Sequence, residues 1–82
     1  MNRSTHSASE SVSRYFELGL SYCSGDPSSQ DLVLAHKWLN LAAIGGSDEA
    51  RTLRAEVARD MTPEQIAAAQ KLAREHLGQS IH

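Results

Sequence analysis

The sequence is poor in cysteine, proline and aromatic residues. Its 82 residues include one Cys, two Pro, one Trp, one Phe and two Tyr. Because Cys23 is the only cysteine, the chain can form neither an internal disulfide bond nor a zinc site built on several cysteines. A fold without these cross-links depends on the packing of apolar side chains, for which few large rings are available.

Basic residues and long apolar runs are also scarce. Eight Lys and Arg stand against ten Asp and Glu, which gives a net charge of −2. Because non-specific nucleic-acid binding requires a basic surface, we do not expect nucleic acid as the principal ligand. No apolar run approaches the roughly 20 residues of a membrane span, and residues 1–13 lack the apolar stretch of a secretory signal. We therefore expect a cytoplasmic protein with no membrane partner.

The sequence is rich in alanine and in helical periodicity. Eleven residues are Ala, which suits closely packed helices better than sheets. Apolar residues recur at steps of three and four in four segments, which begin near residues 11, 30, 48 and 63. No segment alternates as a strand would. The sequence therefore predicts an all-α fold of four short antiparallel helices that form two helical hairpins.

Turn residues mark the ends of these helices. Gly25 and Pro27 are expected to end the first helix, because glycine adopts positive φ and proline cannot continue the backbone ladder. Gly46 is expected to end the second helix and Gly78 the fourth. The domain then spans residues 11–78, between disordered tails at 1–10 and 79–82.

Capping residues mark the starts of the helices. Ser28 or Ser29 is expected to cap the second helix and Ser47 the third, since serine side chains accept hydrogen bonds from the first free N–H groups. Thr62 and Gln65 form the clearest signal, a capping box with a proline at the first helical position.

The first two segments match a known repeat in spacing and residue type. The matching residues are Leu18, Gly19, Tyr22, Gly25, Asp31, Ala35, Trp38, Ala42, Ala43, Gly46 and Ala50. In this order they resemble the Sel-one-like repeat (SLR), a tetratricopeptide-like helical hairpin of about 36 residues. Two positions depart from the pattern: Pro27 stands where a second glycine is usual, and Ser28 where an apolar residue is usual.

The resemblance implies a small solenoid fragment. Residues 11–46 correspond to one full repeat, and residues 47–78 to a degenerate capping hairpin. Arg54 stands where Leu18 stands in the repeat, and a polar residue there implies an outer face turned to water, as in a terminal cap. The resemblance further implies a non-enzymatic adaptor or regulatory scaffold from a bacterium.

The first helix has more apolar residues than one packing stripe requires. One interpretation buries Tyr15 and Phe16 within the monomer. The other leaves at least one exposed as a partner-binding anchor, with Tyr22 as a further anchor and Arg51 and Arg54 as rim charges. The partner is then a protein or peptide, and a homodimer through the first helix competes for the same surface.

A second hypothesis concerns the third helix. Arg51, Arg54 and Arg59 follow a glycine-containing turn and resemble the reading surface of a helix-turn-helix protein. This pattern would suit a small DNA-binding regulator. Acidic residues on the same helix, Asp48 and Glu56 among them, favour the alternative of a solvated outer face.

No residue set predicts catalysis, a cofactor or a metal site. Cys23 and His36 lie on neighbouring helices, but no third group is evident to orient them as nucleophile and base. We expect Cys23 to be buried and inert. His6 and His82 fall in the expected tails, whereas His36 and His76 are expected to face solvent rather than bind metal.

Overall fold

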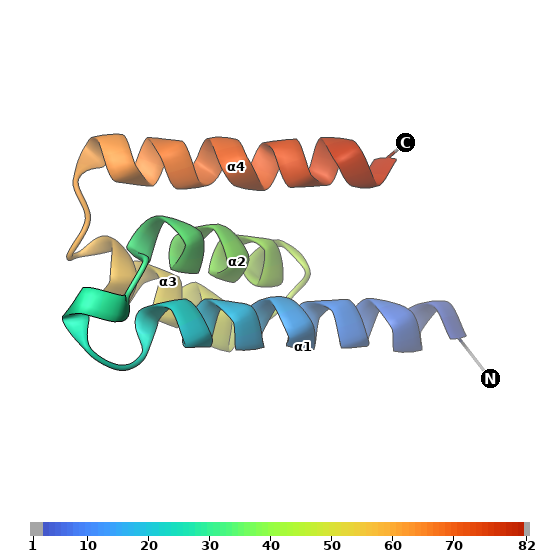
Figure 1. Cartoon of the computed structure of the whole chain (residues 1–82). Coiled ribbons are helices and arrows are strands. Elements are labelled where there is room, and N and C mark those ends of the chain that lie inside the picture. Colours follow the sequence, from blue (N-terminus) through green and yellow to red (C-terminus); the bar gives the residue numbers. More distant parts are fainter. Residues whose placement is uncertain (1–2, 82) are drawn as a thin grey trace.

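The structure is a computed structural model that describes the backbone of residues 3–81 and the side chains of residues 10–78 (Figure 1). Four α-helices lie within this range: α1 (Arg3–Cys23), α2 (Leu32–Ile44), α3 (Asp48–Ala58) and α4 (Pro63–Ile81). A short 3-10 turn, η1 (Pro27–Ser29), follows α1. No strand occurs in this part of the chain, so the prediction of an all-α fold with four helices is confirmed.

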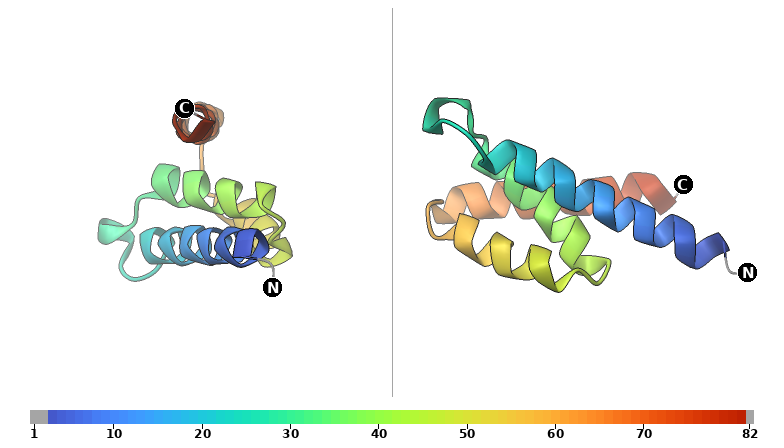
Figure 2. Two further views of the ribbon diagram at one scale, coloured as in Figure 1. Left: turned by 90° about the vertical axis from the view of Figure 1, so that its right-hand side faces the viewer. Right: turned by 90° about the horizontal axis from the view of Figure 1, so that it is seen from below.

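Helix α2 is the centre of the packing, because α1, α3 and α4 each pack against it. Helices α1 and α4 lie on opposite sides of α2, and α3 lies behind (Figure 1). Both outer helices extend past the C-terminal end of α2 (Figures 1 and 2). A helix covered from three directions has few positions left for solvent.

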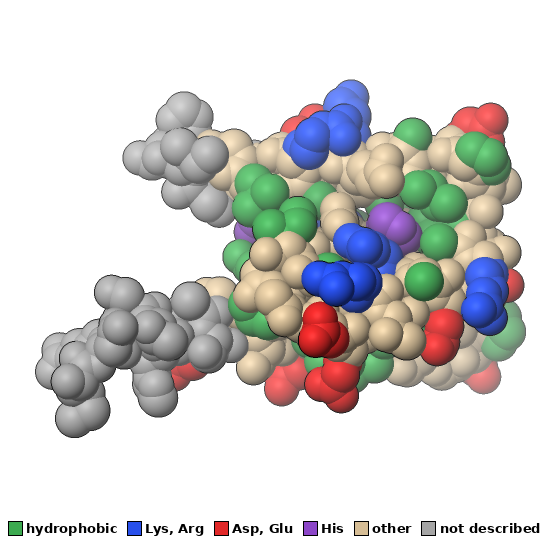
Figure 3. Space-filling model, turned by 180° about the vertical axis from the view of Figure 1, so that it is seen from behind, with side chains coloured by type: hydrophobic (Ala, Val, Ile, Leu, Met, Phe, Trp, Pro, Cys, Tyr) green, Lys and Arg blue, Asp and Glu red, His purple; other side chains and the backbone are tan. Residues whose placement is uncertain are grey.

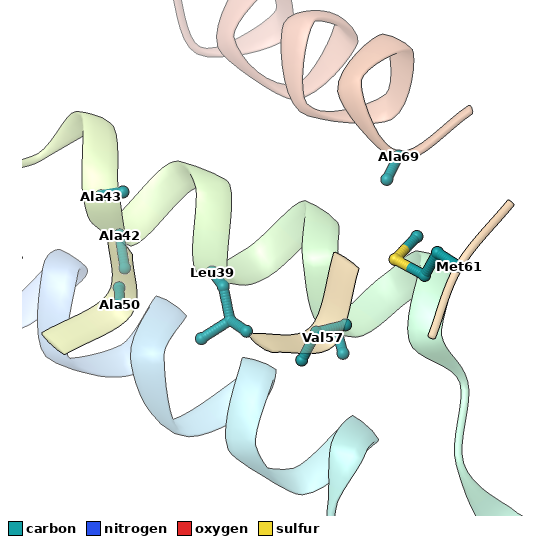
Figure 4. Packing of buried hydrophobic residues seen from close by; sticks show 8 residues of the cluster. Leu39, Ala42, Ala43, Ala50, Val57, Met61 and Ala69 are labelled. Atoms are coloured by element: carbon teal, nitrogen blue, oxygen red, sulfur yellow. The ribbon is translucent and has the colours of Figure 1, made fainter. Parts of the chain in front are cut away.

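The core is built largely from small side chains. The buried cluster consists of Ala35, Leu39, Ala42, Ala43, Ala50, Val57, Met61 and Ala69 (Figure 4). Leu39 is the one large side chain in it that is fully buried among the described residues. A Cβ atom on Gly19 would stand 2.6 Å from Cγ of Leu39, so only glycine lets α1 approach α2 this closely. A glycine at this position of the repeat pattern predicts such a close approach between the two helices, and the structure confirms it.

The local start and stop signals are confirmed at three places. The hydroxyl of Ser47 accepts from the N–H of Ala50 at 3.1 Å. Thr62 and Gln65 form the reciprocal capping box: the Thr62 hydroxyl accepts from the Gln65 N–H at 3.1 Å, and the Gln65 side chain accepts from the Thr62 N–H at 2.8 Å. Gly46 has a φ of 109°, which favours glycine at the end of α2.

The cap predicted for α2 is wrong. Asp31 caps this helix, and its carboxylate accepts from the N–H of Leu34 at 3.1 Å. Ser28 and Ser29 lie in η1, where the N–H of Ser29 donates to the carbonyl oxygen of Asp26 at 2.9 Å. The serines are therefore held in a separate turn before the helix begins.

Both outer helices are longer than the sequence predicts. Helix α1 begins at Arg3 rather than at Ser11, so the stretch expected to be a disordered tail is helical from residue 3 to residue 10. It contains no proline or glycine to interrupt the ladder. Helix α4 continues through Gly78 to Ile81, because Gly78 lacks positive φ and does not reverse the chain. Residues 1, 2 and 82 of the expected tails lie outside the described residues.

Candidate interaction surface

Three rings from three helices meet in one cluster. Tyr15 of α1 stacks on Trp38 of α2 with 5.6 Å between ring centroids. His76 of α4 contacts both rings edge-on, at 5.5 Å from Tyr15 and 5.4 Å from Trp38. The Tyr15 hydroxyl lies 3.2 Å from Nε2 of His76. This aromatic cluster joins α1 to α4 across α2, and all three rings are half-buried.

A lysine adds positive charge to the aromatic cluster. The Nζ atom of Lys37 lies 4.2 Å from the ring centroid of Trp38. A cation over an indole face contributes about 0.5–1 kcal/mol at an exposed site. The cluster therefore combines half-buried rings with a half-buried lysine.

The three predicted aromatic anchors are neither fully buried nor fully exposed. Tyr15, Phe16 and Tyr22 are half-buried, and all three pack against the core cluster. All three lie on α1, which packs against α2, and part of each side chain stays accessible. Whether any of them binds a partner stays a prediction.

Among the side chains of residues 10–78, the most exposed large apolar ones are three others: Leu20 at 37%, Ile44 at 59% and Leu77 at 36% of their full surface. The helical periodicity of the fourth segment predicts that Leu77 faces inward, which is wrong, and it gives no prediction for Ile44. Ile44 is the last residue of α2, where the covering helices no longer pack on all sides, and its position before two glycines was the available signal.

The two predicted rim arginines lie in different environments. Arg51 is exposed, and its Nη1 atom lies 3.5 Å from Oδ1 of Asp48. Arg54 is half-buried, and its Nη1 donates a hydrogen bond to Oδ1 of Asn40 on α2. Arg59 is exposed and directly follows the last residue of α3. Arg51 and Arg54 therefore lie one turn apart on α3 but differ in burial and in hydrogen-bond or ion-pair partner.

His36 is buried, so the prediction that it faces solvent is wrong. Only 4% of its surface is exposed, and its Nδ1 atom has no hydrogen-bond partner. Burial lowers the pKa of His36 below its ordinary value, and the nearby positive charge of Arg54 lowers it further. The imidazole is therefore neutral at physiological pH. The single-stripe reasoning failed because α2 is buried on more than one side.

Cys23 is half-buried rather than fully buried. Its Sγ lies 3.6 Å from the carbonyl oxygen of Leu20. Burial raises the pKa of the Cys23 thiol, and a hydrogen bond with the backbone offsets part of the rise. The thiol form therefore predominates at neutral pH, which does not suit a nucleophile. Within the described residues, no group of three or more His, Cys, Asp or Glu side chains could hold a metal ion.

The face that carries α3 has a depression between α3 and α4 (Figure 3). Histidine and hydrophobic side chains lie at its bottom, and Lys and Arg side chains lie on both sides (Figure 3). The basic residues of these two helices are Arg51 and Arg54 on α3 and Lys71 and Arg74 on α4. We call this depression the α3–α4 groove; α2, against which both helices pack, lies beneath it.

No family description, curated protein or solved structure is similar enough to this chain to count as a match. In the part of the chain that the structure describes, no helix is both long enough and apolar enough to cross a membrane.

Proposed function

We propose that this protein is a non-enzymatic interaction module that binds a segment of another protein or a peptide, as an adaptor or regulatory scaffold. The observation that carries the proposal is the aromatic cluster of Tyr15, Trp38 and His76, half-buried beside a lysine. Aromatic side chains with accessible faces and charged neighbours are typical of binding hot spots. The described side chains can make contacts with a partner, and they include no nucleophile–base pair.

The architecture is proposed to be a tetratricopeptide-like pair of repeats of the Sel-one-like type. Residues 11–46 would form the full repeat and residues 47–78 the capping hairpin. Support comes from the antiparallel order of the helices, the close approach at Gly19 and the glycine turn at Gly46. A bacterial source and a cytoplasmic location belong to the same proposal.

The binding energy would come from two kinds of contact. Tyr15, Phe16 and Tyr22 can bury the surface that the monomer leaves exposed, at about 25 cal/mol per Å² of apolar area. Arg51 and Arg54 would supply charge at the rim, which directs association more than it adds affinity.

A peptide-display selection on the full chain tests the proposal. Selected peptides are retested by fluorescence anisotropy against Tyr22→Ala, with Ser13→Ala, an exposed neutral position on the same helix, as control. We expect Tyr22→Ala to weaken binding by roughly tenfold and Ser13→Ala to leave it unchanged, with helicity retained in both. A selection that yields no peptide above background contradicts the proposal.

Self-association uses the same surface and is measured separately. Light scattering over a concentration range reports the mass of the full chain in solution. A dimer that Phe16→Asp weakens, with helicity retained, would identify a second copy as the partner of α1. A strict monomer leaves this surface for a different protein.

A DNA-binding regulator is the alternative function. The ion pair between Arg51 and Asp48 reduces the positive charge that α3 offers to DNA, which disfavours this alternative. Titration with duplex DNA over a range of salt distinguishes the two functions. A steep fall of the binding constant with salt would favour DNA binding, and no binding at low salt would exclude it.

A further inference from the structure

Arg54 is a half-buried cation, and no anionic side chain of residues 10–78 forms an ion pair with it. Its guanidinium donates to the neutral amide oxygen of Asn40. The one ion pair among the described side chains joins Arg51 to Asp48, one turn away on the same helix. A half-buried charge is costly unless it is paired, and a neutral amide compensates only part of that cost.

The groups left over around Arg54 are hydrogen-bond donors. The bond between the two side chains uses the Asn40 oxygen, which is the acceptor of that side chain. What remains is the Asn40 amide NH2 and the other guanidinium N–H groups of Arg54. A planar set of donors with a positive charge suits an anion with two oxygen atoms, since such bonds are charge-assisted and can form in pairs.

The buried imidazole near Arg54 carries no charge. His36 lies one turn before Asn40 on α2, so both are on the side of α2 that meets α3. Its imidazole is 4% exposed and its Nδ1 atom has no partner. Lys and Arg side chains lie on both sides of the α3–α4 groove (Figure 3). The groove therefore attracts an anion that its own residues do not supply.

We propose that Arg54 and Asn40 form a carboxylate-binding site in the α3–α4 groove, which takes an acidic side chain of the bound protein segment. The proposal rests on the proposed interaction function and names the chemistry of its partner. A single half-buried cation between apolar side chains fits one carboxylate. Exposed Asp48 and Glu49 at the start of α3 repel the extended phosphate backbone of a duplex.

Defined peptides test the chemistry. The first probe is a labelled, C-terminally amidated peptide of alternating Leu and Glu; the second carries Gln in place of Glu; the third is the Gln peptide with a free C-terminal carboxylate. We expect the Glu peptide to bind the full chain at least roughly tenfold more tightly than the amidated Gln peptide. Tight binding of the third probe alone supports the site with a terminal carboxylate as ligand. Equal affinities for all three overturn the proposal.

Matched variants locate the site. Arg54→Gln and Arg51→Gln each remove one positive charge from α3, but only Arg54 belongs to the site. We expect Arg54→Gln to weaken binding of the Glu peptide by roughly tenfold or more. Arg51→Gln should weaken this binding by less than about twofold. Equal losses would indicate general attraction to α3 and overturn the proposal.

Asn40→Asp provides a test that does not depend on the stability of Arg54→Gln. An aspartate at position 40 would place a carboxylate on Arg54 within the chain, and helicity should be retained. We expect Asn40→Asp to weaken binding of the Glu peptide as much as Arg54→Gln does. An unchanged affinity would overturn the proposed carboxylate site.

The outcomes separate this site from the general function. Display-selected peptides that bind without dependence on acidic residues or on Arg54 would refute the carboxylate site and leave the interaction module standing. Displacement of the Glu peptide by duplex DNA with a steep salt dependence would assign the groove to nucleic acid instead.

Discussion

Helices α1 and α4 flank α2 and are attached to it in different ways. Helix α1 is packed by close approach, because Gly19 lies directly against the fully buried side chain of Leu39. Helix α4 contributes the small buried side chains Ala69 and Ala73, and near its C-terminal half it is joined to α1 by the polar contact between Tyr15 and His76. The first interface is apolar and depends on shape, whereas the second includes rings and a hydrogen bond that water can reach.

This difference indicates which part of the molecule stabilises the fold and which part is available for binding. Close apolar packing has one low-energy arrangement and tolerates little change. A half-buried aromatic contact contributes less to stability and leaves part of its rings and polar groups accessible at the surface. We therefore expect substitutions at the α1–α2 interface to lower the free energy of unfolding most, and substitutions at the aromatic cluster to lower it less.

Leu39→Ala should have the largest effect. Leu39 is the large, fully buried side chain of the core cluster, and truncation leaves a cavity between α1 and α2. We expect a loss of roughly 2–5 kcal/mol in the free energy of unfolding, measured by urea titration with far-UV circular dichroism. Leu77→Ala is the control on α4, since that side chain is 36% exposed. Similar losses for the two variants would contradict the comparison.

Gly19→Ala should have the next largest effect. The added Cβ would stand 2.6 Å from Leu39 Cγ and 3.3 Å from Leu39 N, and Leu39 is fully buried. We expect a loss of about 1–3 kcal/mol, which outweighs the better helix propensity of alanine.

Gly78→Ala is the matched control for Gly19→Ala. A Cβ at position 78 meets no atom within 4 Å, so only the gain in helix propensity remains. We expect α4 to become more stable by about 0.5–1 kcal/mol. If both glycine variants stabilise the protein, the close approach of α1 is not required.

The local signals in the sequence predicted much of this fold. The Ser47 cap, the capping box of Thr62 and Gln65, and the turn at Gly46 depend on hydrogen bonds and dihedral angles within a few residues. Such features are encoded where they occur, and the sequence predicts them correctly. The cap of α2 is Asp31 rather than the predicted serine. This cap is also a local feature, but it depends on the turn that starts at Pro27.

The candidate site could be predicted only in part. Burial of His36 depends on how many helices surround α2, which no single helical stripe reveals. The contact between Tyr15 and His76 joins residues 61 positions apart, and the bond between Arg54 and Asn40 joins two helices. The residue types suggested Tyr15 and Arg54 as binding residues, but only the tertiary arrangement identifies their neighbours.

Tyr15→Phe should have a moderate effect. It keeps the stack on Trp38 and removes the hydroxyl that lies 3.2 Å from His76. We expect a loss of about 0.5–1.5 kcal/mol, the usual net contribution of a hydrogen bond. Because Trp38 is the only tryptophan, its fluorescence reports the change directly. Tyr22→Phe is the control, and an equal effect there would assign the loss to phenol hydroxyls in general.

The smallest expected effect is the dependence of stability on His36 protonation. Burial and then the charge of Arg54 lower the pKa of His36 in the folded protein. The unfolded state, with an ordinary pKa of about 6.5, therefore binds the proton first as pH falls. Above a pH of about 6.5, protonation of His36 therefore does not lower the free energy of unfolding. Below that pH it lowers the free energy of unfolding progressively.

His36→Gln isolates this contribution from that of the carboxylates, which titrate in both proteins. Urea titrations between about pH 7.5 and pH 5 should show a smaller loss of stability on acidification for His36→Gln than for the original chain. The Glu peptide should reduce the difference between the two proteins, because a carboxylate on Arg54 offsets the charge that disfavours the imidazolium. Identical pH profiles for the two proteins, with and without peptide, would mean that His36 takes up its proton as readily in the folded chain as in the unfolded one.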